Sequence, residues 1–173
     1  MNLENVKKYL WLLDIIAAVL GMVLVFIPII HHSEPSMSSD YYLLGYKIDH
    51  YPIGDQTTYY EAITLTYRIG MTSLIIILIG TIILLINSIP FSIVKIERWS
   101  KAWVVPIFWL IGGLLMISGI LYYYLGMNSI DSSFWDYWTF SGGILTLIGG
   151  SLAVLSTIFR AIVSLIISRR SKV

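Results

Sequence analysis

The chain has 173 residues, of which 57% are hydrophobic and only 12% are charged. A soluble domain of this size has too little interior to bury so much apolar surface, so part of the surface must face lipid. The net charge of +1 argues against a nucleic-acid partner, and the lack of cysteine excludes disulfides and thiolate sites.

Four segments are long enough to cross about 30 Å of hydrocarbon, which takes about 20 helical residues. None alternates like a barrel strand, so we predict an all-α membrane protein, a bundle of four transmembrane helices with a long first extracytoplasmic loop. The first segment is too long for a signal-peptide core, and we interpret it as a retained span. The predicted order is an N-terminal tail (1–9), first span (10–30), outer loop (31–66), second span (67–91), link (92–102), third span (103–125), short outer loop (126–136), fourth span (137–160) and C-terminal segment (161–173).

Lysine and arginine gather in the two terminal segments and in the link between the second and third spans. Positive charge marks the cytoplasmic side of a membrane protein, so we expect both chain ends in the cytoplasm, with the protein in the cell membrane or, for a viral protein, in a host membrane. The basic residues in question are Lys7, Lys8, Lys95, Arg98, Lys101, Arg169, Arg170 and Lys172.

The first span carries one charged residue, Asp14, on the same helical face as Ala18 and Gly21. In lipid, small residues collect where helix backbones approach closely. We therefore expect Asp14 to lie on a packing face.

The first outer loop is longer than two packed helices need, and loops of that length are usually folded or functional. Pro52, Ile53 and Gly54 form a turn signal between strand-forming residues, so we predict a small β-hairpin or short sheet. Tyrosine-rich surfaces suit protein recognition, although these rings would also serve to cap the bundle and reach the lipid headgroups. The candidate interaction surface is Tyr41, Tyr42, Tyr46, Tyr51, Tyr59 and Tyr60.

The later spans also carry small or polar stripes. In the second span Asn87 is near the cytoplasmic end, and in the fourth span Arg160 interrupts an otherwise apolar run. Helical spacing places Arg160 on one face with five small or polar residues, so it should lie on a packing face rather than toward lipid. Those five are Gly142, Thr146, Gly149, Ala153 and Ser156.

Asp14, Asn87 and Arg160 should thus lie at a similar depth near the inner leaflet, as a structural polar cluster. A lone charge at the centre of a membrane helix costs about 2.5–3.5 kcal/mol on insertion scales, and an ion pair between Asp14 and Arg160 would offset part of that cost. Our hypothesis is such a pair, joined by Asn87. The alternative is that both charged groups snorkel to the inner interface.

No catalytic or metal-binding motif is recognisable. His31, His32 and His50 lie in the outer loop without the spacing of a zinc site, and a single intramembrane aspartate excludes an aspartyl intramembrane protease. We therefore expect no enzymatic activity, no cofactor and no metal.

The function we expect is structural or interactive, exerted through the aromatic outer loop or by lateral association with other membrane proteins or itself. Four helices with one acid in the first resembles the small multidrug-resistance exporters, and this resemblance implies proton-coupled transport centred on Asp14. A third interpretation is an accessory subunit of a larger membrane complex, such as a respiratory one.

Overall fold

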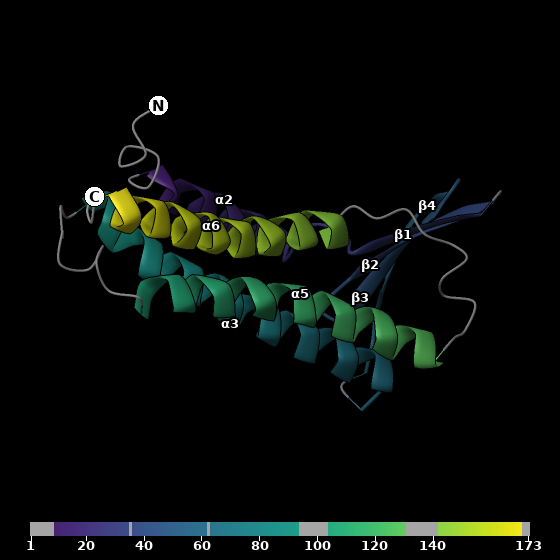
Figure 1. The fold of residues 1–173 in the computed structure, drawn as a ribbon. Helices are drawn as coiled ribbons and strands as arrows, with labels where there is room; N and C mark the ends of the chain where they lie inside the picture. Colours follow the sequence, from purple (N-terminus) through teal and green to yellow (C-terminus); the bar gives the residue numbers. More distant parts are fainter. Residues whose placement is uncertain (1–8, 35, 62, 94–103, 131–141, 171–173) are drawn as a thin grey trace.

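A computed structural model describes residues 9–34, 36–61, 63–93, 104–130 and 142–170. This part of the chain is mostly helical, with four helices and one small antiparallel sheet (Figure 1). The helices are α2 (Trp11–Val23), α3 (Leu65–Ile93), α5 (Val104–Ile130) and α6 (Gly142–Arg170). The sheet lies between α2 and α3 in sequence, within the segment predicted as the first outer loop.

Three helices, α3, α5 and α6, are long and apolar enough to cross a membrane. Helix α3 begins after Thr64, whose hydroxyl accepts the Tyr67 backbone N–H at 3.3 Å, as a helix N-cap does. Helix α6 continues beyond the predicted end of the fourth span to Arg170. Residues 137–141, predicted to begin that span, lie outside the described residues.

The first apolar segment differs from its prediction. Helix α2 has 13 residues and is followed by turns in which Val25 N–H donates to Met22 and Phe26 N–H to Val23. Pro28 lacks a backbone N–H and disfavours helical conformation in the residue before it, which explains why the helix does not continue to residue 30. The end of the apolar run enters the sheet instead, since β1 begins at Ile30.

The helices pack as a ring of neighbours, α2 on α3, α3 on α5, α5 on α6 and α6 on α2. Two reciprocal glycine pairs bring the backbones together. A Cβ built on Gly80 of α3 would meet the carbonyl oxygen of Gly112 in α5 at 2.6 Å, and one on Gly113 would meet that of Gly150 in α6 at 2.7 Å. The adjacent glycines of α5 therefore contact different helices, Gly112 contacting α3 and Gly113 contacting α6. Such close approach of helix backbones is typical of helix contacts in lipid.

The buried core runs between the helices and includes Trp109, Met116 and Ile77. The outward faces of the long helices are also apolar, with large aliphatic side chains exposed along their length. Large apolar outer surfaces of this extent are atypical of soluble monomers. Examples are Ile75, Ile79, Ile82 and Ile86 on α3, Leu114 and Leu121 on α5, and Leu155, Ile162 and Leu165 on α6.

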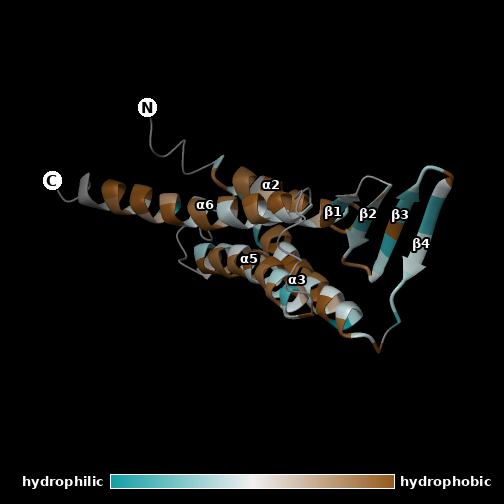
Figure 2. Cartoon of the chain, turned by 90° about the vertical axis from the view of Figure 1, so that its right-hand side faces the viewer, coloured by the Kyte–Doolittle hydropathy of each residue, from teal (hydrophilic) through white to brown (hydrophobic). Residues whose placement is uncertain are grey.

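The sheet is a four-stranded antiparallel meander, which is the short sheet of the two predicted alternatives rather than a single hairpin. Its strands are β1 (Ile30–Glu34), β2 (Met37–Tyr42), β3 (Tyr46–Tyr51) and β4 (Gly54–Tyr59), which neighbour one another in chain order. The predicted turn at Pro52 and Ile53 joins β3 to β4, with Gly54 in a positive-φ conformation of 136°. The strands extend beyond the ends of the helices (Figure 2).

The turn between β2 and β3 fastens the sheet to α3. Gly45 has φ of 84°, and a Cβ there would meet the Tyr67 ring at 2.5 Å. The Leu43 carbonyl lies against Gly70, one turn further along the helix. At the other side of the sheet, Gly142 N–H at the start of α6 donates to the Pro28 carbonyl at 3.1 Å.

Candidate functional site

The strand register divides the side chains of the sheet between two faces. Directly paired residues share a face, and residues alternate along each strand. Ile30 is part of the buried core and its paired residue Tyr41 packs against that core, so these two residues define the helix-side face. The opposite, open face carries alternate residues, which are His31, Ser33, Ser38, Asp40, Tyr42, Tyr46, Ile48, His50, Asp55, Thr57 and Tyr59.

Three of the six predicted tyrosines form an aromatic row (Tyr42, Tyr46 and Tyr59) across the open face. The rings of Tyr42 and Tyr46 stack with centroids 4.5 Å apart, and those of Tyr46 and Tyr59 are tilted at 5.9 Å. The row ends in Tyr59, which is 75% exposed. Stacked aromatic rings with exposed edges offer apolar area and hydroxyl groups to a partner at small entropic cost.

The other three predicted tyrosines lie on the helix-side face. Tyr41 packs against the buried core, and Tyr51 is exposed near the β3–β4 turn. Burial raises the pKa of Tyr60 above its ordinary range, and the nearby Tyr41 and Asp49 raise it further. The sequence-predicted surface is therefore split, and only its open-face half forms a continuous row.

A histidine–aspartate network (His31, Asp40, His50 and Asp55) takes one side chain from each strand of the open face. His31 Nδ1 lies 2.6 Å from Asp40 Oδ1, and His50 Nε2 lies 3.1 Å from Asp40 Oδ2. His50 Nδ1 is 2.9 Å from Asp55 Oδ1. The network crosses all three strand pairs, so it fastens the sheet from one edge to the other.

His50 has carboxylate oxygens at both ring nitrogens. Ionised carboxylates only accept hydrogen bonds, so the doubly protonated imidazolium is the form that satisfies both contacts. The bonds with Asp55 and with Asp40 therefore raise the pKa of His50 above its ordinary value. From the sequence alone, His31 and His50 are considered only as possible metal ligands, because the strand register that brings them beside Asp40 and Asp55 is a long-range property.

The helix-side face holds a second polar group of three residues. Asp49 accepts a hydrogen bond from the Ser39 hydroxyl at 2.5 Å and an ion-pair contact from Lys47 at 2.9 Å. Desolvation acts to raise the pKa of Asp49, but the bonds from Ser39 and Lys47 outweigh it and the pKa is lowered. Asp49 is therefore a structural carboxylate rather than a free acid.

Two of the three residues of the predicted polar cluster, Asp14 of α2 and Arg160 of α6, are buried between the helices. Asp14 is fully buried, and its Oδ1 accepts a hydrogen bond from Ser156 of α6 at 2.7 Å, while its Oδ2 has no hydrogen-bond partner among the described residues. Arg160 is only 4% exposed, with its guanidinium carbon 4.9 Å from the ring centroid of Trp109. All six residues of the stripe that leads from Gly142 to Arg160 are buried, as helical spacing predicts.

Asn87, the third member of the predicted cluster, is half-buried on α3. Its side-chain amide donates to the carbonyl of Ile83, one turn earlier in the same helix, at 2.7 Å. That bond uses one N–H of the amide within α3. The contact between α2 and α6 is instead bridged by Ser156, a residue that the sequence reasoning placed on the packing face without a polar role.

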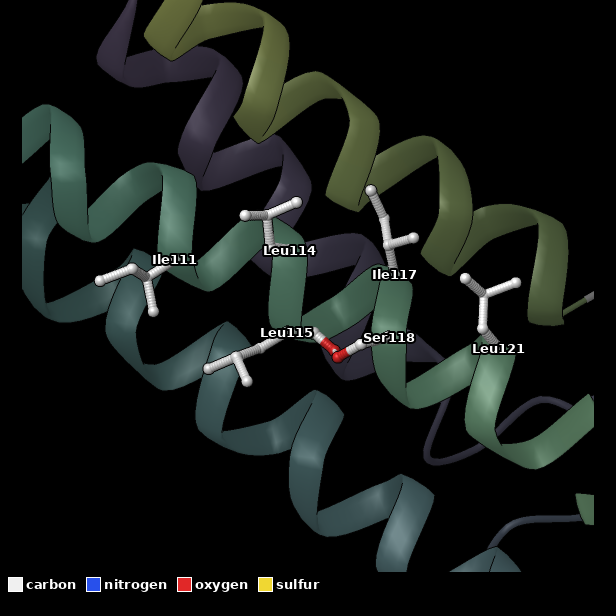
Figure 3. Close-up of a pocket in the computed structure, with 6 residues that line it drawn as sticks. All are labelled: Ile111, Leu114, Leu115, Ile117, Ser118 and Leu121. Atoms are coloured by element: carbon white, nitrogen blue, oxygen red, sulfur yellow. Dashed lines mark hydrogen bonds between the residues drawn. The ribbon is translucent and has the colours of Figure 1, made fainter. Parts of the chain in front are cut away.

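A shallow depression of about 410 Å³ lies on the outward side of α5 (Figure 3). Ser118 is its one polar lining residue, and the Ser118 hydroxyl donates to the Leu115 carbonyl of its own helix at 3.0 Å. No convergent polar groups are available there to orient a small-molecule substrate. The lining residues are Ile111, Leu114, Leu115, Ile117, Ser118 and Leu121.

Within the described residues, no group of three or more histidine, aspartate or glutamate side chains is arranged to hold a metal ion. Neither the models of known protein families nor the sequences of curated proteins show a match to this chain.

Proposed function

We propose that the chain is a multi-pass integral membrane protein without enzymatic activity, which acts by binding other proteins through the aromatic row of its outer sheet. Three helices of spanning length with apolar outward faces support the membrane assignment. The excess of lysine and arginine at both chain ends and in the 92–102 link supports cytoplasmic termini and an extracytoplasmic sheet.

In this proposal the first apolar segment also crosses the membrane, completing a four-helix bundle. Asp14 is bonded to Ser156 and Pro28 to Gly142, so the chain from Asp14 to Pro28 runs antiparallel to the same length of α6. Helix α6 advances about 1.5 Å per residue, so its stretch from Gly142 to Ser156, and with it the chain from Pro28 to Asp14, extends about 21 Å, and the first turn of α2 adds about 5 Å. The combined length is close to the roughly 30 Å of a hydrocarbon core.

The observation that carries the binding function is the aromatic row, which is half-buried at Tyr42 and Tyr46 and exposed at Tyr59, on a sheet that projects beyond the helices (Figure 2). The helices themselves approach at glycine pairs, with carbonyl oxygens less than 3 Å from any added Cβ. Contacts this close favour a solid scaffold. A solid helical scaffold that holds a tyrosine-rich sheet outside the membrane suits recognition by contact.

The test compares partners captured in the native membrane by chemical cross-linking and mass spectrometry. Replacing Tyr59→Ala and Tyr46→Ala should remove the proteins that the unaltered chain captures, because both rings belong to the aromatic row. Tyr51→Ala is the matched control, since it removes an exposed tyrosine from the other face of the sheet.

The proposal for the aromatic row would be overturned if the same proteins were captured by the unaltered chain, by the variant with Tyr46→Ala and Tyr59→Ala, and by the Tyr51→Ala control. Capture that is insensitive to the row but consists of the subunits of one membrane assembly would favour lateral association, as an accessory subunit.

A second candidate function, proton-coupled transport centred on Asp14, is favoured by one specific observation. One carboxylate oxygen of this fully buried residue has no hydrogen-bond partner among the described residues. Buried acids inside membrane segments often mark proton pathways. Transport requires that Asp14 exchange its proton with water on both sides of the membrane.

Proteoliposomes with an imposed pH gradient and a pH-sensitive dye test this candidate. Asp14→Asn should abolish substrate-dependent proton release, whereas Ser156→Ala should only change its rate. Identical proton flux with and without Asp14, measured across a panel of organic cations, would exclude the candidate.

A further inference from the structure

In the part of the chain that the structure describes, strand β4 forms a free edge of the sheet. In the sheet order it neighbours only β3, and five of its six residues are exposed. An edge strand presents unpaired backbone N–H and C=O groups that form a template for another strand.

The backbone pairing determines which groups of β4 point outward. Tyr60 N–H donates to the Gly45 carbonyl at 2.8 Å, so position 60 belongs to the residues that bond to the β3 side. In antiparallel pairs, hydrogen-bonded and non-hydrogen-bonded positions alternate. The N–H and C=O groups of Asp55, Thr57 and Tyr59 therefore point away from β3.

This edge lacks the features that usually protect an edge strand. From Gly54 to Tyr59 the strand contains neither proline nor lysine, and its register with β3 runs without a bulge. Its single charge, Asp55, is already bonded to His50. The opposite edge, β1, follows directly from the α2 segment and begins with the buried Ile30, so β4 is the more accessible of the two.

We propose that β4 is an interface for a second copy of this chain, paired antiparallel across a two-fold axis at Thr57. In a continuous sheet, paired residues lie on the same face. Because faces alternate along a strand, a two-fold axis that pairs β4 with itself must pass through a residue and not between two residues. Centring on Thr57 pairs Asp55 with Tyr59 of the second copy. In that register every outward N–H and C=O group from Asp55 to Tyr59 forms a hydrogen bond with the second copy. An axis through Gln56 would leave some of these groups without a partner.

The side chains of this register are compatible with self-pairing. Thr57 faces Thr57 of the second copy, a cross-strand pair that is favourable in antiparallel sheets. The two Asp55 carboxylates lie at opposite ends of the new ladder, so no like charges face each other. One pair of short strands makes a small interface, and we expect a reversible dimer. This inference concerns the sheet edge and does not depend on a partner at the aromatic row.

Because the chain has no cysteine, a single introduced thiol reports the pairing in the full-length protein. Hydrogen-bonded antiparallel pairs have Cα atoms about 5.5 Å apart, within the range of a disulfide. In proteoliposomes under mild oxidation, the Thr57→Cys variant should form a disulfide dimer many times faster than the Ile53→Cys variant. Ile53 is 99% exposed at the turn, so it is the more accessible thiol but lies off the axis.

A second, cysteine-free variant measures the association itself. Thr57→Pro removes an outward N–H that the β3–β4 ladder does not use, so the variant should keep its own sheet but lose the dimer in sedimentation experiments in detergent. Equal cross-linking at positions 53 and 57, or a dimer that survives Thr57→Pro, would overturn the proposal. If Thr57→Pro loses the dimer but still captures the same partner proteins through the aromatic row, the proposed function stands independently of the dimer.

Discussion

His50 links three strands of the sheet through hydrogen bonds that depend on its protonation. Its ring joins β3 to β2 through Asp40 and to β4 through Asp55, and His31 shares the Asp40 carboxylate. Both carboxylates favour the protonated ring and raise the pKa of His50. Protonation of one imidazole therefore strengthens the attachment of the last strand, on which the proposed dimer depends.

The raised pKa sets the sign of the pH dependence. The stabilising effect of the His50 imidazolium is complete below the unfolded-state pKa of about 6.5 and is lost as the pH rises through the higher folded-state value. Thermal unfolding of the sheet, followed from about pH 5 to about pH 8, should show a decreasing midpoint, and His50→Gln should remove most of that slope. Parallel pH profiles for both proteins would contradict this prediction.

Asp14 and Arg160 should be coupled in stability. Both side chains are buried, and Arg160 lies one turn of α6 beyond Ser156, which donates to Asp14. Removing one of two compensating buried charges costs about 3–5 kcal/mol because it leaves the other charge uncompensated. We expect Asp14→Leu and Arg160→Met each to lower the free energy of unfolding in detergent by that order. The double variant should lose markedly less than their sum, and effects that add within about 0.5 kcal/mol would show that the two charges act separately.

At the level of elements, the glycines at positions 112 and 113 place α5 between α3 and α6. An added methyl group on either glycine would meet a backbone carbonyl oxygen of a different neighbouring helix, and backbone cannot move aside as the end of a flexible side chain can. A helix packed in this way transmits a local change to both interfaces.

Gly113→Ala should therefore destabilise the protein, because the new Cβ would meet the Gly150 carbonyl at 2.7 Å. Overpacking of this kind typically costs about 1–3 kcal/mol. The matched control is Ser118→Ala, an exposed position on the same helix. The measurement is thermal unfolding in detergent, and equal midpoints for the two variants would contradict the close approach of α5 and α6.

Helical elements were predictable because their signal is local. The stripe from Gly142 to Arg160 repeats at helical spacing, and burial follows from that spacing. The end of α2 was harder to foresee, because Ile29 and Ile30 prolong the apolar run although they leave the helix. Both are buried, so an extended segment satisfies their hydrophobicity as well as a helix does.

The sheet was only partly predictable. Pro52 and Gly54 indicate the β3–β4 turn, but β1 and β2 are rich in histidine, serine and aspartate, which carry little strand signal. The network of His31, Asp40 and His50 depends on the pairing of separate strands, and register is not encoded by any one strand. The polar cross-links of the sheet therefore became visible only in three dimensions.

For the whole molecule, the proposed topology places the sheet and the C-terminus on opposite sides of the membrane. Single thiols introduced by Gln56→Cys in β4 and by Ser171→Cys in the basic tail should react differently with a membrane-impermeant maleimide added to intact cells. We expect labelling of the first only, and labelling of both after the membrane is opened. Reaction of both thiols in intact cells would contradict the topology.

The sheet is also joined to the helices at two separate places. Strand β1 continues from the α2 segment, whose Pro28 carbonyl is bonded to the start of α6, while the β2–β3 turn rests on Tyr67 and Gly70 of α3. Sliding of α2 along α3 would therefore have to shear the ladder between β1 and β2. The sheet therefore restrains the ends of the helices. A displacement of α2 along its own axis would change the alignment of the strands, and with it the positions of the rings in the aromatic row.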